Sequence, residues 1–396
     1  MSSTVNSFDL NAYDVIAIDM DNTLVKYNLK NTLPLIHELL QKYLIEKYNY
    51  PEDIRQEFCP KLSQKGLVID KQNGNVLKLD ANFAVMSAKH GFTDLTKQEI
   101  DNIYGKVYAE KLTEILELLV TGTLYIDFDF AVLKDYFTSP AAQVFAKCVD
   151  VLDKVNVSSG NEVNYWQLWT DIYNGLCFMY ERQQFKARSG GWFPELIENP
   201  DKYLVKASES VRQMLKNLRQ KGKQVLLVTS SNVDFTRHLM KHCYGNQWID
   251  YFDYVLTYAR KPTFFTCDRK FLIVDSDDSI GDAIAVEDLK CGHIYAEGNW
   301  ADLKTFAAKM LSKSQPKCVY IGDSFIDDCI VPEKYVNCHT IGIVEELEAE
   351  NRWELDSSYW KSFIDINKNN TLWFQLLRDH TQLIVPYFES LVNYCV

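Results

Sequence analysis

Two aspartates separated by one residue follow a short apolar run near the start of the chain. Asp19 and Asp21 come directly after Val15–Ile18, and Thr23 follows two residues later. Side chains two apart on an extended segment point the same way, so the two carboxylates can converge on one site. One can attack phosphorus while the other moves the leaving group's proton. Alone, the pair also fits a solvated acidic loop, because short acidic motifs are common.

Three further segments carry groups that suit a phosphate and a cation. Thr229 and Ser230 follow an apolar run and can offer hydroxyl and backbone N–H donors to phosphate oxygens. Lys261 can neutralise a phosphate and hold a carboxylate. Asp323 and Asp328 lie on either side of a turn and can present hard oxygens to Mg²⁺. Taken singly, these segments also fit a helix cap, a basic turn and an acidic turn.

The elements that must position these groups are short strands. Four continuous apolar runs, 15–18, 225–228, 254–256 and 319–321, each end at polar residues. Continuous rather than alternating hydrophobicity predicts strands that are buried on both faces of a parallel sheet. The spacing of apolar residues predicts a helix over 208–220, with Gly222 as its stop signal. We therefore expect an α/β fold with a doubly wound, mainly parallel sheet.

A long insertion separates the first strand from the second. Such a connection needs a core of its own, so we expect a large, mostly helical cap domain with helices at Phe130–Val149 and Tyr165–Phe185. The expected divisions are core 1–28, cap 29–205, core 206–352 and a helical C-terminal extension 353–396. In that extension the pattern predicts one helix, Thr371–Tyr394, interrupted at Pro386.

Composition and charge restrict the partners and the compartment. The 396 residues carry a formal net charge of -12, which argues against a nucleic-acid partner. The sequence has no run of about 18 apolar residues to span a bilayer and no secretory signal at its start. The ten cysteines include no CxxC pair. We expect a cytoplasmic protein with no membrane partner.

The four polar segments, in their order along the chain, resemble the motifs of the haloacid dehalogenase-like superfamily of phosphatases. The resemblance implies that Asp19 is the nucleophile that forms an aspartyl-phosphate, and that Asp21 is first the general acid and then the base. It implies that Thr229 and Ser230 bind the phosphoryl group and that Lys261 stabilises the charge. The second aspartate is typical of phosphatases, because an alcohol leaving group needs a proton and a halide does not.

The same resemblance implies Mg²⁺ as the cofactor. Its ligands would be Asp19, Asp323 and the main-chain carbonyl of Asp21. Asp328 would orient Lys261 or the groups around the metal. A dianionic phosphate does not approach a carboxylate unless the metal and a lysine offset the repulsion.

A narrower resemblance lies in the inserted segment. Gly66–Asp70, Gly74–Asp80, His90–Phe92 and Ala259–Phe265 are similar to the signature of cytosolic purine 5′-nucleotidases and their domain-containing relatives. The similarity covers residues 13–345 and implies that the substrate is a nucleoside 5′-monophosphate. Gly74 and the residue after it also fit a plain β-hairpin turn.

The sequence departs from this family pattern where the base would be recognised. A gapless placement puts Tyr173, Cys177 and Tyr180 where characterised relatives have arginine, aspartate and histidine. Losing those groups removes the hydrogen bonds that discriminate a purine. Lys186 falls where a phosphate-contacting lysine is expected, and Ser230 replaces an asparagine.

We therefore expect a Mg²⁺-dependent phosphomonoester hydrolase, with a nucleoside 5′-monophosphate as the leading substrate. One alternative keeps the chemistry and acts on a sugar phosphate or another non-nucleotide ester. Another alternative is a binding or scaffold protein on the same fold, against which the intact set of acidic and basic motif residues argues. Homo-oligomers are common among the relatives, so self-association is compatible with this interpretation.

Overall fold

The computed structural model describes residues 8–105, 110, 128–159, 162–349, 359–364 and 371–395. Its central sheet is built from nine strands of these residues. In spatial order they are β12 (Ile280–Ile284), β11 (Phe271–Val274), β13 (His293–Glu297), β10 (Tyr254–Thr257), β9 (Gln224–Val228), β1 (Val15–Ile18), β14 (Cys318–Gly322), β15 (His339–Ile343) and β16 (Leu383–Val385). All neighbours pair in parallel except β11, which is antiparallel to both β12 and β13.

Helices cover both faces of this sheet. Ile16 and Ile18 belong to one apolar core with α9 (Glu209–Gln220) and α10 (Val233–Tyr244). The alternate residues Val15 and Ala17 belong to a second core with α12 (Trp300–Met310) and α13 (Val331–Val336). A strand buried on both faces explains the continuous apolar runs. The expected doubly wound, mainly parallel α/β fold is confirmed, and so is the helix over 208–220, which begins at the N-cap Ser208.

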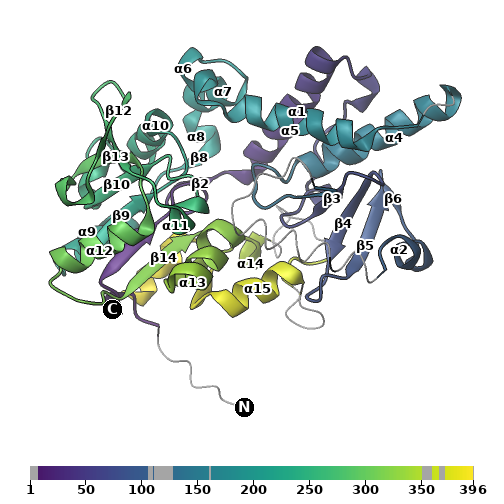
Figure 1. Cartoon of the computed structure of the whole chain (residues 1–396). Coiled ribbons are helices and arrows are strands. Elements are labelled where there is room, and N and C mark those ends of the chain that lie inside the picture. The colour runs from purple at the N-terminus through teal and green to yellow at the C-terminus, as the bar shows by residue number, and fades with distance from the viewer. Residues whose placement is uncertain are drawn as a thin grey trace.

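A second body of structure lies between β2 (Lys26–Tyr27) and β8 (Leu204–Val205), which pair with each other. The helices among its described residues are α1 (Leu29–Tyr48), α2 (Lys97–Ile103), α4 (Ala141–Ser159), α5 (Tyr165–Tyr180), α6 (Arg182–Ala187), α7 (Trp192–Glu198) and α8 (Pro200–Tyr203). An antiparallel sheet joins β6 (Thr93–Asp94), β5 (Val85–His90), β4 (Asn75–Leu79), β3 (Val68–Asp70) and β7 (Phe130–Val132). We call this region the cap. In Figure 1 its sheet lies to the right of the central sheet, with α1, α4 and α5 above.

The remaining elements are short. The other α-helices are α11 (Thr263–Thr266), α14 (Glu346–Ala349) and α15 (Leu372–His380). Single-turn 3₁₀ segments lie at Leu10–Ala12, Glu52–Ile54, Pro60–Leu62, Trp248–Tyr251 and Val286–Asp288, and a longer one at Phe388–Tyr394. A π-type turn spans Phe325–Ile330. Within the described residues, no helix combines the length and apolar character needed to cross a bilayer.

Two helices expected in the cap differ from the structure. The segment expected as a helix from Phe130 begins as strand β7 and continues as a loop, and α4 begins only at Ala141, after Pro140. A proline disfavours the helical conformation of the residue before it, which explains why the helix starts only after Pro140. The expected helix Tyr165–Phe185 is two helices, because Glu181 between them has extended backbone angles.

The C-terminal segment also departs from the expected helical extension. The helix α15 ends at His380, and the chain then forms β16, which pairs in parallel with β15. Thr381 has an extended backbone, and Gln382 donates its N–H to the Thr340 carbonyl. Pairing with the open edge of β15 therefore overrides the helical pattern there. The interruption expected at Pro386 lies after this strand.

Candidate active site

Polar residues follow the carboxyl ends of three adjacent strands. Asp19 continues β1, Thr229 continues β9 and Asp323 continues β14. Because β1 lies between β9 and β14 and runs parallel to both, the three ends share one edge of the sheet. Open α/β sheets bind ligands at this edge.

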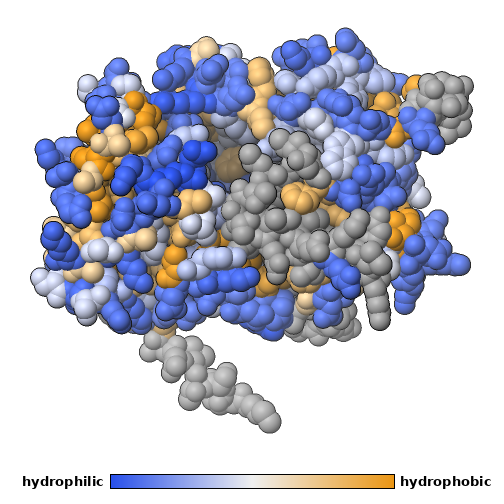
Figure 2. All heavy atoms as spheres, viewed as in Figure 1, coloured by the Kyte–Doolittle hydropathy of each residue, from blue (hydrophilic) through white to orange (hydrophobic). Residues whose placement is uncertain are grey.

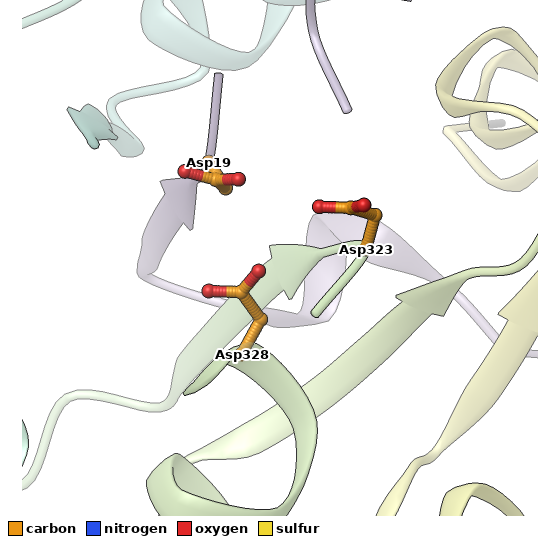
Figure 3. Close-up of side chains that lie close together, drawn as sticks. All are labelled: Asp19, Asp323 and Asp328. Atoms are coloured by element: carbon orange, nitrogen blue, oxygen red, sulfur yellow. The ribbon is translucent and has the colours of Figure 1, made fainter. Parts of the chain in front are cut away.

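Three carboxylates meet at this edge. Asp19, Asp323 and Asp328 are buried, and each offers an oxygen within 4.8 Å of the others. In Figure 3 the three side chains point toward one another from β1, from the end of β14 and from the turn that follows β14. The Ser324 N–H donates to Asp328 Oδ2 over 3.1 Å, which fixes that carboxylate. A side chain at Gly322 would collide with Asp328, so the turn requires glycine.

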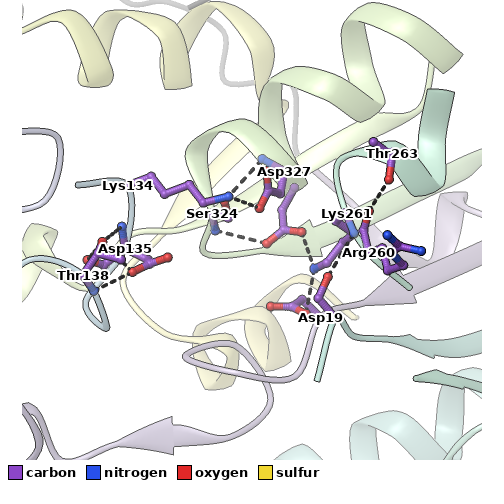
Figure 4. A network of polar contacts seen from close by, with 11 residues as sticks. Asp19, Lys134, Asp135, Thr138, Arg260, Lys261, Thr263, Ser324 and Asp327 are labelled. Atoms are coloured by element: carbon purple, nitrogen blue, oxygen red, sulfur yellow. Dashed lines mark hydrogen bonds and ion pairs between the residues drawn. The ribbon is translucent and has the colours of Figure 1, made fainter. Parts of the chain in front are cut away.

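Lys261 supplies the positive charge. Its Nζ lies 2.7 Å from Asp19 Oδ1 and 2.6 Å from Asp328 Oδ1, and its side chain is 5% exposed. Its backbone N–H donates to Ser230 Oγ over 3.0 Å, which ties the lysine segment to the end of β9. Figure 4 shows the Lys261 side chain reaching the Asp19 carboxylate. The lysine therefore bridges the nucleophile candidate and the acidic turn.

Burial dominates the electrostatics of this cluster. It raises the pKa of Asp19, an effect that Lys261 opposes and Asp21 reinforces. Burial also raises the pKa of Asp328 to about 7 and the pKa of Asp323 well above its usual value. Burial alone would lower the pKa of Lys261, but Asp19 and Asp328 raise it well above its ordinary value. Asp19 and Asp328 therefore share the ammonium group of Lys261, while the charge of Lys65 opposes the rise in the pKa of Asp323.

Asp21 has a different environment. The Tyr27 hydroxyl donates to its Oδ1 and the Ser231 hydroxyl donates to its Oδ2, each over 2.7 Å. Burial raises the pKa of Asp21, and these two hydrogen bonds oppose the rise. Thr229 Oγ1 accepts the N–H of Ser231 over 3.1 Å, which orders the loop after β9. Asp21 is thus hydrogen-bonded to neutral hydroxyls rather than ion-paired.

A cavity of about 390 Å³ opens over these groups. Its surface is hollowed near the centre of the view in Figure 2. The core contributes Asp19, Asp21, Thr229, Ser230, Ser231, Asn232, Asp234, Phe235, Lys261, Asp323, Ser324, Asp327 and Asp328, and the cap contributes Lys134, Asp135, Phe137, Tyr180, Arg182, Phe185, Trp192 and Phe193. The core side of the cavity is therefore mostly polar and the cap side mostly aromatic.

The structure brings most of the predicted site residues together. Asp19, Asp21, Thr229, Ser230, Lys261, Asp323 and Asp328 all line the cavity. Lys186 does not line it and is exposed, whereas Arg182 and Phe185 from the same helix do. The expected contact of Lys186 with the phosphate therefore stays a prediction, and this arrangement of α6 gives it no support. Of the three residues placed in the base-reading positions, only Tyr180 reaches the cavity.

Several cap residues at the cavity escaped the sequence analysis. Lys134, Asp135 and Phe137 lie in the loop between β7 and α4, which we had expected to be helical. Lys134 Nζ pairs with Asp327 Oδ2 over 2.7 Å, a contact between cap and core that is visible in Figure 4. The Thr138-Ser139-Pro140 sequence is a turn signal that would have moved the helix start beyond this loop.

The cluster fits a hard divalent cation. Burial raises the pKa of all three nearby carboxylates, and their mutual repulsion adds to the rise, so a cation among them would stabilise their charged forms. Carboxylate oxygens are the ligands that Mg²⁺, Ca²⁺ and Mn²⁺ prefer. The donor set alone does not distinguish among these metals.

Comparison with known proteins agrees with this geometry. The model of the 5′ nucleotidase family matches residues 4–384. The 5′-nucleotidase domain-containing protein 1 of Homo sapiens is 33% identical over 352 residues, which cover 87% of this chain and 74% of that protein. The 5′-nucleotidase domain-containing protein 2 of Rattus norvegicus is 28% identical over 352 residues, which cover 88% and 59%.

The family match confirms the resemblance to 5′-nucleotidases and their domain-containing relatives that the inserted segment indicates. It makes the protein a phosphoric monoester hydrolase with a small phosphate ester as substrate. The chain therefore belongs to the 5′ nucleotidase family.

Proposed function

We propose that the protein is a Mg²⁺-dependent 5′-nucleotidase that releases phosphate from a nucleoside 5′-monophosphate through an aspartyl-phosphate on Asp19. The observation that carries this proposal is the contact of Lys261 with both Asp19 and Asp328 on the floor of the cavity, next to Asp21. A carboxylate held as an anion beside a cation is a competent nucleophile toward phosphorus.

The first step transfers the phosphoryl group to the protein. A carboxylate oxygen of Asp19 bonds to phosphorus as the bond between phosphorus and the ester oxygen breaks. Asp21, in its protonated form, gives its proton to the departing oxygen, which leaves as an alcohol. The raised pKa of Asp21, caused first by its burial, favours the protonated form that this step needs.

The second step releases phosphate. Asp21, now a carboxylate, takes a proton from water as the water oxygen bonds to phosphorus and the bond to Asp19 breaks. Phosphate leaves and Asp19 regains its carboxylate. Thr229 and Ser230 line the cavity next to Asp19 and Lys261, where their donors suit the phosphoryl oxygens.

A divalent cation would be held by Asp19, Asp323 and the main-chain carbonyl of Asp21. When bound, it offsets the charge between the phosphate and the carboxylate. Asp328 contributes by holding Lys261, while the Ser324 N–H fixes Asp328 in turn.

The cap side of the cavity supports an aromatic leaving group. The ring centroids of Phe137 and Trp192 lie 6.0 Å apart, and those of Tyr180 and Trp192 lie 5.8 Å apart. All three rings line the cavity. Aromatic faces bind a planar base without hydrogen bonds that select one base. A pocket of this size is also within the usual range for small-molecule sites.

Phosphate release from a panel of nucleoside 5′-monophosphates and sugar phosphates tests the proposal. We expect turnover in Mg²⁺, its loss in EDTA and its restoration by excess Mg²⁺. Asp19→Asn removes the nucleophile and should lower kcat by about 10³-fold or more, a loss typical of removing a covalent catalyst. Asp14→Asn at the opposite end of the same strand is the matched control and should retain activity.

Two results would contradict the proposal. Equal turnover by the wild type and Asp19→Asn would exclude Asp19 as the nucleophile. A higher kcat/KM for sugar phosphates than for every mononucleotide would exclude the nucleotide substrate and keep the chemistry.

A further inference from the structure

We propose that Tyr27 is a positioning residue for Asp21. Its hydroxyl keeps the Asp21 carboxyl oriented toward the leaving group, and its ring contacts Phe137 and Trp192 on the cap side of the cavity. The inference rests on the proposed function, because it assigns Asp21 the role of acid and base. It adds a residue that none of the four sequence motifs contains.

The contacts of Asp21 leave little freedom to its carboxylate. One oxygen accepts the Tyr27 hydroxyl and the other accepts the Ser231 hydroxyl, each over 2.7 Å. Ser231 comes from the loop after β9 and Tyr27 from β2, so the two donors reach Asp21 from separate elements. A carboxylate that is hydrogen-bonded on both oxygens keeps one orientation, and losing one donor allows it to turn.

Tyr27 itself stays out of the cavity. The residue is 1% exposed and does not belong to the cavity lining. It acts on the substrate only through Asp21 and through the rings that it contacts, which makes it a positioning residue rather than a catalytic one.

The place of Tyr27 in the fold links the acid to the cap. Tyr27 of β2 pairs with Leu204 of β8, and these two antiparallel strands connect the core to the cap. Its ring meets Phe137 edge-on at 5.2 Å and stacks on Trp192 at 6.4 Å. Phe137 and Trp192 line the cavity, so a leaving group bound against them would contact the same two rings that pack on Tyr27.

This geometry predicts an effect that depends on the leaving group. An alcohol must receive a proton as it departs, whereas a nitrophenolate is stable enough to leave without one. Displacing the acid should therefore slow the cleavage of a nucleoside 5′-monophosphate and spare the cleavage of 2,4-dinitrophenyl phosphate. The parameter to compare is kcat/KM, because it reports the formation of the aspartyl-phosphate and not its hydrolysis.

The test is Tyr27→Phe, which removes only the hydroxyl. We expect kcat/KM for a nucleoside 5′-monophosphate to fall by about tenfold to thirtyfold and kcat/KM for 2,4-dinitrophenyl phosphate to fall by less than about threefold, in line with part of the usual general-acid contribution. Ser231→Ala removes the other donor and should show the same selectivity. Tyr203→Phe is the matched control, because this buried tyrosine next to β8 donates to Glu195 rather than to Asp21.

A second variant separates the hydroxyl from the packing. Tyr27→Leu removes the ring as well as the hydroxyl, so any loss beyond that of Tyr27→Phe reports the contribution of the ring's packing. Melting temperatures of all variants report whether they are folded. Equal losses on both esters, or no loss at all, would overturn the inference. Failure of the wild type on both esters would instead overturn the proposed function.

Discussion

Two buried lysines occupy different regions of this protein and have different surroundings. Lys261 lies between two carboxylates at the carboxyl edge of the central sheet and lines the cavity. Lys65, in the cap segment before β3, is 1% exposed and pairs with Glu346 of α14 over 3.2 Å. The faces of Tyr136 and Phe325 lie 4.2 and 4.6 Å from its Nζ, and the residue does not line the cavity.

Burial and pairing with a carboxylate are common to both lysines and therefore do not distinguish them. Lys65 is enclosed by a carboxylate and two rings from the cap and the core, so its charge ties the two regions together. Lys261 faces a cavity in which a phosphate can approach it. Access to a substrate, rather than burial or pairing, distinguishes the two residues.

Replacing Lys261 should give the larger effect on activity. We expect Lys261→Met to lower kcat/KM by about 10²–10³-fold, the loss typical of removing one electrostatic contact to a transition state. The measurement is phosphate release in excess Mg²⁺, where the cation offsets part of the charge that the lysine leaves behind. A loss below about tenfold would mean that Lys261 only supports the structure.

Replacing Lys65 should instead affect stability. We expect Lys65→Met to lower the free energy of unfolding by about 3 kcal/mol, because it leaves Glu346 buried without its partner. Denaturant unfolding measures this change, and kcat/KM in excess Mg²⁺ should stay within about fivefold at a temperature where the variant is folded. Combining Lys65→Met with Glu346→Leu should recover part of the stability. Unchanged stability together with a loss of activity as large as that of Lys261→Met would reverse the comparison.

Bound Mg²⁺ should raise the free energy of unfolding through the cavity carboxylates, independently of the ion pair between Lys65 and Glu346. Mg²⁺ at a hundredfold excess over its Kd should raise the free energy of unfolding by about 2.7 kcal/mol, since only the folded chain presents the three carboxylates together. Thermal unfolding at constant ionic strength measures the shift. It should disappear in Asp323→Asn and persist in Asp14→Asn and Lys65→Met. A shift that survives Asp323→Asn would place the cation elsewhere.

The pair between Lys134 and Asp327 is intermediate, because it joins cap and core at the cavity while remaining partly exposed. The side chains of Lys134 and Asp327 are 28% and 13% exposed, so the pair should contribute no more than about 1 kcal/mol. We expect Lys134→Met to raise KM up to about fivefold and to change kcat by less than about twofold, since the residue lines the substrate side of the cavity. A double-mutant cycle with Asp327→Asn measures the coupling. A coupling above about 2 kcal/mol would place this pair with the buried ones.

The sequence predicted the core better than the cap for a local reason. Asp19, Thr229 and Asp323 each directly follow a strand, and parallel neighbours place those ends at one edge. In the cap, the helical pattern at Tyr165–Phe185 was nearly right, but it did not show the break at Glu181 or that Arg182, rather than Lys186, lines the cavity. Arg182 and Lys186 are four residues apart and share one face of α6, so the packing of this short helix decides which of them reaches the cavity, and sequence spacing does not resolve it.

The sequence by itself determined the doubly wound fold and the set of acidic, hydroxyl and basic groups at the strand ends, because both follow from residues close together in the chain. Only the tertiary structure decided that Tyr27 orients Asp21, that Phe137 and Trp192 form the wall above it, and that Lys65 pairs with Glu346. Those contacts join segments far apart in the chain, and their geometry depends on how the cap packs on the core.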